Sequence, residues 1–450
     1  MDCFVPRNDD TCRLSLVVSY ENKPSKKREM TKPITGNREM WLNVLNFTGL
    51  LRKLAMTIHV AVIARNEAIQ KTLNIYVLQN LSSVTIKQSG KRRISKYCIF
   101  SSLKRQSCAI KTRILVPIIA LCASVLIFPP IVAQVSQQEF RVMFYNVENL
   151  FDTEDDPHVN DNEFLPNGTR RWTPGRYYSH LQQTAKVINA VGEWDTPVLV
   201  GLCEVENDSV MIHLINRTPL RAQNYRYCIT QGIDPRGINV ALLYQRDKFQ
   251  YIDHQSKRIP FSQTGRRSRD ILHVWGRIIT GDTLDVFVCH FPSRSGGEKE
   301  TEQARLDAAQ YLRHLCDSLH DVRQTTCILA MGDFNDYPPD KSIQIILNSS
   351  EPKRNLLHLF ADKKALNFEG SYKFQGEWGQ LDQMMVSRSW AAFLKQGSPR
   401  IFNAPFMMTD DRTWKGVRPL KVYNGYRYEG GFSDHLPVVA DFLIPIQHDQ

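Results

Sequence analysis

The chain has 450 residues, of which 42% are hydrophobic and 23% charged, and this composition excludes a fibrous or a fully disordered protein. Its formal net charge of +11 would suggest a nucleic-acid-binding protein, but the charge is unevenly distributed. Residues 1–113 carry 21 Lys and Arg against 7 Asp and Glu, whereas the remaining residues carry 36 against 39. A strongly electropositive face is therefore not expected after residue 113.

Residues 1–110 form a basic extension with no sustained helical or strand period, no repeat and no motif. Residues 111–133 begin with two basic residues, continue with about twenty mostly apolar ones and end at Ala133 before a polar stretch. This pattern predicts a signal peptide, and its length also permits a membrane-spanning anchor over residues 114–133. We expect either a natural start near residue 110 followed by export to the periplasm or medium, or a basic cytoplasmic segment before a signal anchor. Both place the rest of the chain outside the cytoplasm.

Residues 138–445 change character and predict one large α/β domain. Two segments, 177–194 and 302–319, repeat apolar residues every three or four positions, as amphipathic helices do. Short apolar runs between them are typical of strands covered on both faces, which suggests two packed sheets with helices outside. The predicted strands are 140–146, 197–204, 225–230, 238–244, 272–279, 284–290, 326–333, 382–387 and 436–442.

The ten cysteines include no CxxC pair and no spacing suited to zinc. Three of them, Cys203, Cys289 and Cys327, lie inside apolar runs, where a buried free thiol is the expected state.

Polar side chains recur where these predicted strands begin or end. Any one of them is more often a turn, cap or core residue, but the repetition favours a functional site at the rim of the sheets. The residues are Asn146, Glu148, Glu204, His290, Asp333, Asn335, Asp382, Asp434 and His435.

The motifs around these residues are specific. The segments YNVEN, LCEVEN, VCHFPSR, MGDFND, QLDQMMVS and GFSDHLPV occur in the order and strand context of the endonuclease/exonuclease/phosphatase superfamily. The chain resembles an exported bacterial member of that superfamily over roughly residues 138–445. The resemblance implies a four-layer α/β/β/α sandwich of the deoxyribonuclease I type, with two mostly antiparallel or mixed sheets.

The resemblance also implies a divalent-metal site. Glu204 corresponds to the principal Mg²⁺ ligand, helped by Glu148 and Asn146, while Asp434 adds charge next to the metal. Mn²⁺ is a possible substitute for Mg²⁺. Such a hard cation needs only one or two carboxylates together with waters and substrate phosphate oxygens.

The remaining roles concern proton transfer and phosphate binding. By resemblance, His435 activates water or binds the scissile phosphate and is oriented by Asp382. Asp333 and Asn335 position the nucleophile and the phosphate, and His290 contributes a proton or hydrogen bond. From the sequence alone, Arg236 is a candidate phosphate ligand or a solvated turn residue.

Two loops each allow two interpretations. Residues 152–163 are acidic enough for Ca²⁺ but lack the EF-hand spacing, which favours a solvated loop. Residues 412–430 interleave aromatic and basic side chains, which suits either substrate stacking or a hairpin that covers the sandwich.

We therefore expect an exported Mg²⁺-dependent phosphodiesterase that acts on DNA, RNA or another phosphate ester, with no obligate protein partner. A phosphomonoesterase or a lipid or inositol-phosphate phosphoesterase on the same fold is the alternative. A binding module that has kept the fold without catalysis is a third reading.

The expected start near residue 110 can be tested by N-terminal sequencing of the natively expressed protein. A mature N-terminus close to residue 134 would agree with a cleaved signal peptide. A product that retains residues 1–110 would rule out the late start.

Overall fold

The computed structural model describes residues 136–362 and 364–446. The expectations for residues 1–110 and 111–133 fall outside these residues. Among the described helices, none combines the length and apolar character needed to span a bilayer.

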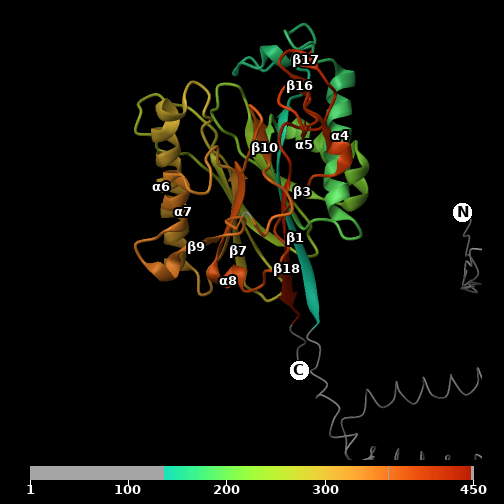
Figure 1. Ribbon diagram of the computed structural model, residues 1–450. Coiled ribbons are helices and arrows are strands. Elements are labelled where there is room, and N and C mark those ends of the chain that lie inside the picture. Colours follow the sequence, from blue (N-terminus) through green and yellow to red (C-terminus); the bar gives the residue numbers. More distant parts are fainter. Residues whose placement is uncertain (1–135, 363, 447–450) are drawn as a thin grey trace, which may run out of the picture. The chain divides into compact units, whose positions relative to one another are not determined.

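Two mixed six-stranded sheets form the centre of the described domain (Figure 1). The first sheet contains, in spatial order, β13 (Arg400–Ile401), β18 (Val438–Pro445), β1 (Gln137–Leu150), β2 (Leu199–Val205), β4 (Asn239–Tyr244) and β3 (Arg226–Ile229). The second contains β5 (Gln250–Lys257), β6 (Ile271–Arg277), β7 (Thr283–His290), β8 (Cys327–Asp333), β12 (Asp382–Ser387) and β9 (Leu356–His358).

Helices cover the outer face of each sheet, so the layers follow the order α/β/β/α. In Figure 1, α4 (Pro174–Gly192) and α5 (Asp208–Asn216) lie on one side, and α6 (Glu298–Val322) and α7 (Lys341–Leu347) lie on the other. A further short helix, α8 (Arg388–Ala391), follows β12. The predicted α/β sandwich is thus confirmed.

The long elements form where their sequences specify them. The apolar runs of β8 and β12 are buried at every position, as strands between two layers require. Helix α4 begins at Pro174 after the N-cap Thr173, whose hydroxyl accepts from the amide of Arg176. The predicted helices and the nine predicted strands all occur, with bounds shifted by a few residues.

Some elements carry no clear periodic signal. Strand β5 lies at a sheet edge with no fully buried residue, so its sequence QYIDHQSK shows no apolar alternation. Three hairpins and four 3₁₀ turns are too short to show a period. The hairpins are β10 (Tyr372–Phe374) with β11 (Glu377–Gly379), β14 (Met408–Asp410) with β15 (Val417–Pro419), and β16 (Tyr423–Asn424) with β17 (Arg427–Tyr428). The 3₁₀ turns are Asn162–Phe164, Pro219–Gln223, Pro352–Arg354 and Pro405–Met407.

The central pair of strands is parallel in each sheet: β1 with β2, and β7 with β8. Parallel neighbours end at the same edge, so the polar residues that follow these four strands reach a common rim. Strand β12 runs antiparallel to β8, and its first residue, Asp382, lies opposite Asp333.

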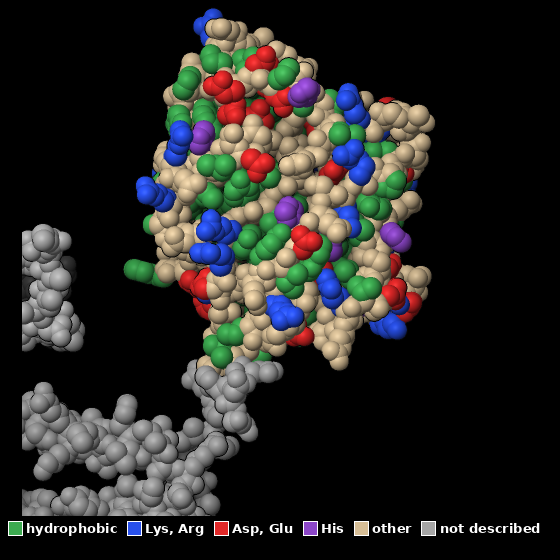
Figure 2. Space-filling view, turned by 180° about the vertical axis from the view of Figure 1, so that it is seen from behind, with side chains coloured by type: hydrophobic (Ala, Val, Ile, Leu, Met, Phe, Trp, Pro, Cys, Tyr) green, Lys and Arg blue, Asp and Glu red, His purple; other side chains and the backbone are tan. Residues whose placement is uncertain are grey.

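The cysteines and the surface charges of the described residues agree with what the sequence led us to expect. The five cysteines among the described residues are free and buried, as expected for the three in apolar runs. On the face seen in Figure 2, basic side chains are interspersed with acidic ones and form no continuous basic surface.

Trp390 links the two sheets at the end of β12. Its fully buried ring contacts Phe140 of β1 at 5.5 Å and Phe442 of β18 at 4.8 Å, between ring centroids. We expect Trp390→Ala to lower the free energy of unfolding by about 3–5 kcal/mol, because no side chain fills the cavity. Trp390→Phe should cost less, since it keeps a ring and removes an indole N–H that has no partner. Urea unfolding of the three proteins measures this, and equal stability of Trp390→Ala and the unmodified protein would contradict it.

Candidate active site

A cleft of about 770 Å³ opens at the common rim of the two sheets. Seven of the ten residues predicted from the sequence line it: Glu204, Arg236, His290, Asp333, Asn335, Asp434 and His435. Two others, Asn146 and Asp382, lie beneath it and hydrogen-bond to residues of the lining.

Asn146 joins the two sheets at the floor of the cleft. Its side-chain amide donates to Asp333 Oδ2 at 3.1 Å and lies 3.3 Å from Glu204 Oε1. Glu204 Oε2 also accepts from the backbone amide of Asn149 at 2.9 Å, so the carboxylate is held at both oxygens. The ends of β1, β2 and β8 are therefore tied together through one amide group.

The backbone at these positions is unusual. Glu204 has φ of +63° and Asn335 has φ of +52°, both in the left-handed region that non-glycine residues rarely adopt. The pairing of β2 with β4 shifts register between Cys203 and Val205, which places a bulge at Glu204. Bulges and left-handed residues re-aim side chains at strand ends, and here they direct Glu204 and Asn335 into the cleft.

His435 and Asp382 form a buried pair. The imidazole Nδ1 and Asp382 Oδ2 are 2.7 Å apart, so Nε2 is left to face Asp333 Oδ2 at 3.8 Å. Burial lowers the pKa of His435, but the carboxylates of Asp382, Asp333 and Asp434 outweigh burial and raise this pKa well above its ordinary value. His435 therefore carries its proton at neutral pH.

Asp333 lies between two histidines. Its Oδ2 is 3.8 Å from His435 Nε2 and 3.8 Å from His290 Nε2, while its Oδ1 accepts from the amide of Asn335. Burial, reinforced by Asp382 and opposed by His435, raises the pKa of Asp333 to about 7. A carboxylate with such a pKa is suited to accept a proton near neutral pH.

His290 has the opposite electrostatic character to His435. Burial, together with the positive charges of Arg269 and Arg236, lowers the pKa of His290 well below its ordinary value. The ring is therefore neutral, and its 3.8–3.9 Å separations from Asp333 and Glu204 are too long for hydrogen bonds.

Arg236 is held at the cleft through Asp234, which also pairs with the buried Arg269. Arg269 donates to Asp234 and to the carbonyl groups of His290 and Phe291. Asp234 also accepts from the backbone amide of Arg236 and lies 3.5 Å from its guanidinium, which remains half exposed. The Arg236 side chain therefore has donors available for a ligand.

Glu148 does not join this group. Both of its carboxylate oxygens accept backbone amide hydrogens, from Val422 at 2.8 Å and Tyr423 at 3.0 Å. Its φ of +55° turns the side chain toward that loop, and it does not line the cleft. The family resemblance implied a second metal-binding glutamate at this position, whereas in the structure Glu148 anchors a loop.

Neither of the two loops whose role the sequence did not decide lines the cleft. Residues 152–163 are mostly exposed. Tyr423 is buried against Trp172, with ring centroids 6.0 Å apart, so part of the 412–430 segment covers the sandwich.

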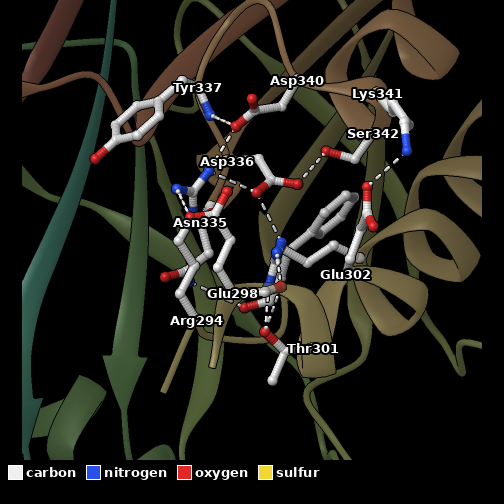
Figure 3. Close-up of polar contacts among 12 residues, drawn as sticks. Arg294, Glu298, Thr301, Glu302, Asn335, Asp336, Tyr337, Asp340, Lys341 and Ser342 are labelled. Carbon is white, nitrogen blue, oxygen red and sulfur yellow. Dashed lines mark hydrogen bonds and ion pairs between the residues drawn. The ribbon is translucent and has the colours of Figure 1, made fainter. Parts of the chain in front are cut away.

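A network of charges behind the cleft fixes the loop after β8 (Figure 3). Asp336 forms ion pairs at 2.8 Å with Arg294, which lines the cleft, and with the fully buried Arg305 of α6. Ser342 of α7 donates to its second oxygen. Arg294 also donates to the carbonyl of Asn335. Arg294 and Asp336 lie within the motifs HFPSR and GDFND. The sequence did not predict their roles, because their partners are distant in sequence.

The donor set suits a hard cation. Glu204, Asp333, Asp382 and Asp434 lie in or under one cleft, and across residues 136–362 and 364–446 no Lys or Arg forms an ion pair with any of them. Of these, Asp382 is bound to His435, and the other three line the cleft. Carboxylate oxygens of this kind are the ligands that Mg²⁺ and Mn²⁺ take.

Comparison with known proteins gives the family. The model of the Endonuclease/Exonuclease/phosphatase family matches residues 141–443. No curated protein sequence matches the chain significantly.

Similar solved structures have low identity. An endonuclease/exonuclease/phosphatase family protein from Bacteroides thetaiotaomicron is 15% identical with a TM-score of 0.44, covering 70% of this chain and 100% of that one. A mannosyl-6-phosphatase from the same organism is 16% identical with a TM-score of 0.42, over 68% and 99% of the two chains. The human Nocturnin catalytic domain is 16% identical with a TM-score of 0.40, over 68% and 97%.

Asp336 provides a test of the network in Figure 3. We expect Asp336→Asn to lower the free energy of unfolding by about 3–5 kcal/mol, because the buried Arg305 loses its counter-charge. Glu302→Gln is the matched control, since it removes the exposed Lys341–Glu302 pair in the same region. That change should cost about 0–1 kcal/mol. Equal effects of the two substitutions in urea unfolding would refute the structural role of Asp336.

Proposed function

Because the chain belongs to the endonuclease/exonuclease/phosphatase family, we propose that it is a divalent-metal-dependent phosphoesterase that attacks phosphodiester bonds with an activated water. The observation that carries the proposal is the position of Asp333. One oxygen of this carboxylate, Oδ2, faces His435 and His290 and accepts from Asn146.

Glu204 and Asp434 would hold the metal, with Asn146 fixing the orientation of Glu204. Mg²⁺, or Mn²⁺ in its place, would neutralise negative charge on the phosphate and on the leaving oxygen. The carboxylates described above explain why a cation is favoured at this rim.

The protein's own groups supply the proton transfers. Asp333, with a pKa of about 7, accepts the proton of the attacking water. Protonated His435 donates from Nε2 to a phosphate oxygen, and Asp382 keeps the ring in that orientation and stabilises its charge.

Neutral groups and one arginine complete phosphate binding. The side-chain amide of Asn335 donates to the carbonyl of Phe291, and its side-chain oxygen would position the attacking water. Neutral His290 and the half-exposed Arg236 hydrogen-bond to phosphate oxygens. Export through residues 111–133 remains part of the proposal and rests on the sequence of that segment.

We expect Glu204→Gln and His435→Ala each to lower kcat/KM by at least about 100-fold, because each removes a charge that acts on the transition state. EDTA should abolish turnover, and Mg²⁺ or Mn²⁺ should restore it. The assay compares bis-p-nitrophenyl phosphate, p-nitrophenyl phosphate, DNA, RNA and inositol phosphates.

His314→Ala is the control, because His314 is exposed on α6, away from the cleft lining. Full activity of His435→Ala, or turnover that EDTA leaves unchanged, would refute the proposed mechanism. A preference for p-nitrophenyl phosphate or inositol phosphates would instead identify a phosphomonoesterase that uses the same residues.

A further inference from the structure

Three aromatic side chains line the cleft. Tyr372 packs against the catalytic imidazole, with ring centroids 4.7 Å apart. Phe374 and Tyr337 line the same cleft, and Phe374 is 57% exposed although it is a large apolar side chain. An exposed phenylalanine at the edge of a polar site is a candidate contact for a ligand.

Strand geometry places Phe374 one step farther from the catalytic pair than Tyr372. Residues two apart on a strand point to the same face, so both side chains of β10 face the cleft. Their separation along the strand is roughly 7 Å. Phe374 is therefore within reach of an organic group attached to a phosphate held at His435.

The intervening Lys373 points the other way and holds the hairpin in place. Its buried ammonium group lies 3.0 Å from Asp411 and donates to the carbonyl groups of Lys415 and Val417. These contacts attach the β10–β11 hairpin to the β14–β15 hairpin. Phe374 is thus exposed but carried on a fixed support, which reduces the entropy lost when it contacts a ligand.

Polar side chains also line the cleft. Ser293, Ser295, Arg294 and Glu298 line it, from the segment between β7 and the first turn of α6. The Arg294 guanidinium lies over the Tyr337 ring, 4.4 Å from its centroid. A ligand in the cleft therefore meets aromatic rings as well as hydroxyl and charged groups.

A nucleobase suits this mixed lining, because its flat face stacks on an aromatic ring while its edges form hydrogen bonds. An acyl chain would leave the polar groups of the lining without partners. We propose that Phe374 stacks on a base of the substrate, so that the preferred substrates are phosphate esters that carry a nucleobase next to the scissile phosphate. This inference rests on the proposed phosphoesterase function.

The test uses substrate pairs that differ only in the base. Adenosine 5′-monophosphate is compared with ribose 5-phosphate, and a thymidine dinucleotide with its analogue that lacks bases. Mannose 6-phosphate represents a sugar ester. We expect the base-bearing member of the hydrolysed pair to have at least about tenfold higher kcat/KM.

Phe374→Ala should raise KM for the base-bearing substrate about tenfold, leave kcat nearly unchanged and alter the base-free substrate less than about twofold. Phe374→Trp should retain the preference, because it keeps a stacking ring. Trp194→Ala removes an exposed aromatic that follows α4 and does not line the cleft, and it should change the kinetics of neither substrate.

Equal kcat/KM within both pairs, a preference for mannose 6-phosphate, or an equal effect of Phe374→Ala on both members would overturn the inference while leaving the phosphoesterase proposal intact. Titration calorimetry with adenosine 5′-monophosphate and ribose 5-phosphate measures the same preference without turnover. If no phosphate ester is hydrolysed, the proposed function fails, and tighter binding of the nucleotide would still support stacking at Phe374.

Discussion

The organisation of this domain depends on bringing four carboxylates to one rim of two packed sheets. Glu204, Asp333, Asp382 and Asp434 come from strands or strand ends distant in sequence, and their mutual repulsion opposes the approach of those segments. Protonated His435 and the Asn146 amide relieve part of this repulsion. A bound cation would relieve more of it, so the proposed metal would also stabilise the rim.

Buried charged side chains outside the rim hold in place the chain segments that form it. Arg269 holds the backbone after β7, and Asp336 links the loop after β8 to α6 through Arg305 and to α7 through Ser342. Both arginines are nearly fully buried, so they are effective only because each has a matched carboxylate and carbonyl acceptors. The reactive groups can therefore remain incompletely paired while the chain that carries them is fixed.

Much of this was predictable, and the exceptions have physical causes. Strands such as β8 and β12 are buried on both faces, so their apolar runs reveal them. The edge strand β5 and the short hairpins bury too little to impose a pattern. The motifs identified which residues approach the cleft, but side-chain direction depends on left-handed backbone at Glu148 and Glu204, which no periodicity encodes. Phe374 lies in a three-residue strand between motifs and gave no signal of its own.

The pairing of β1 with β18 places Gln137 directly opposite Pro445. Asn146 lies nine residues along β1, roughly 30 Å from this point, so both ends of the described domain leave it far from the cleft. A fusion partner, affinity handle or immobilising surface attached there would keep the substrate entrance open. The same proximity makes the domain suitable for circular permutation, in which a short linker joins these ends and new termini are cut in an exposed loop.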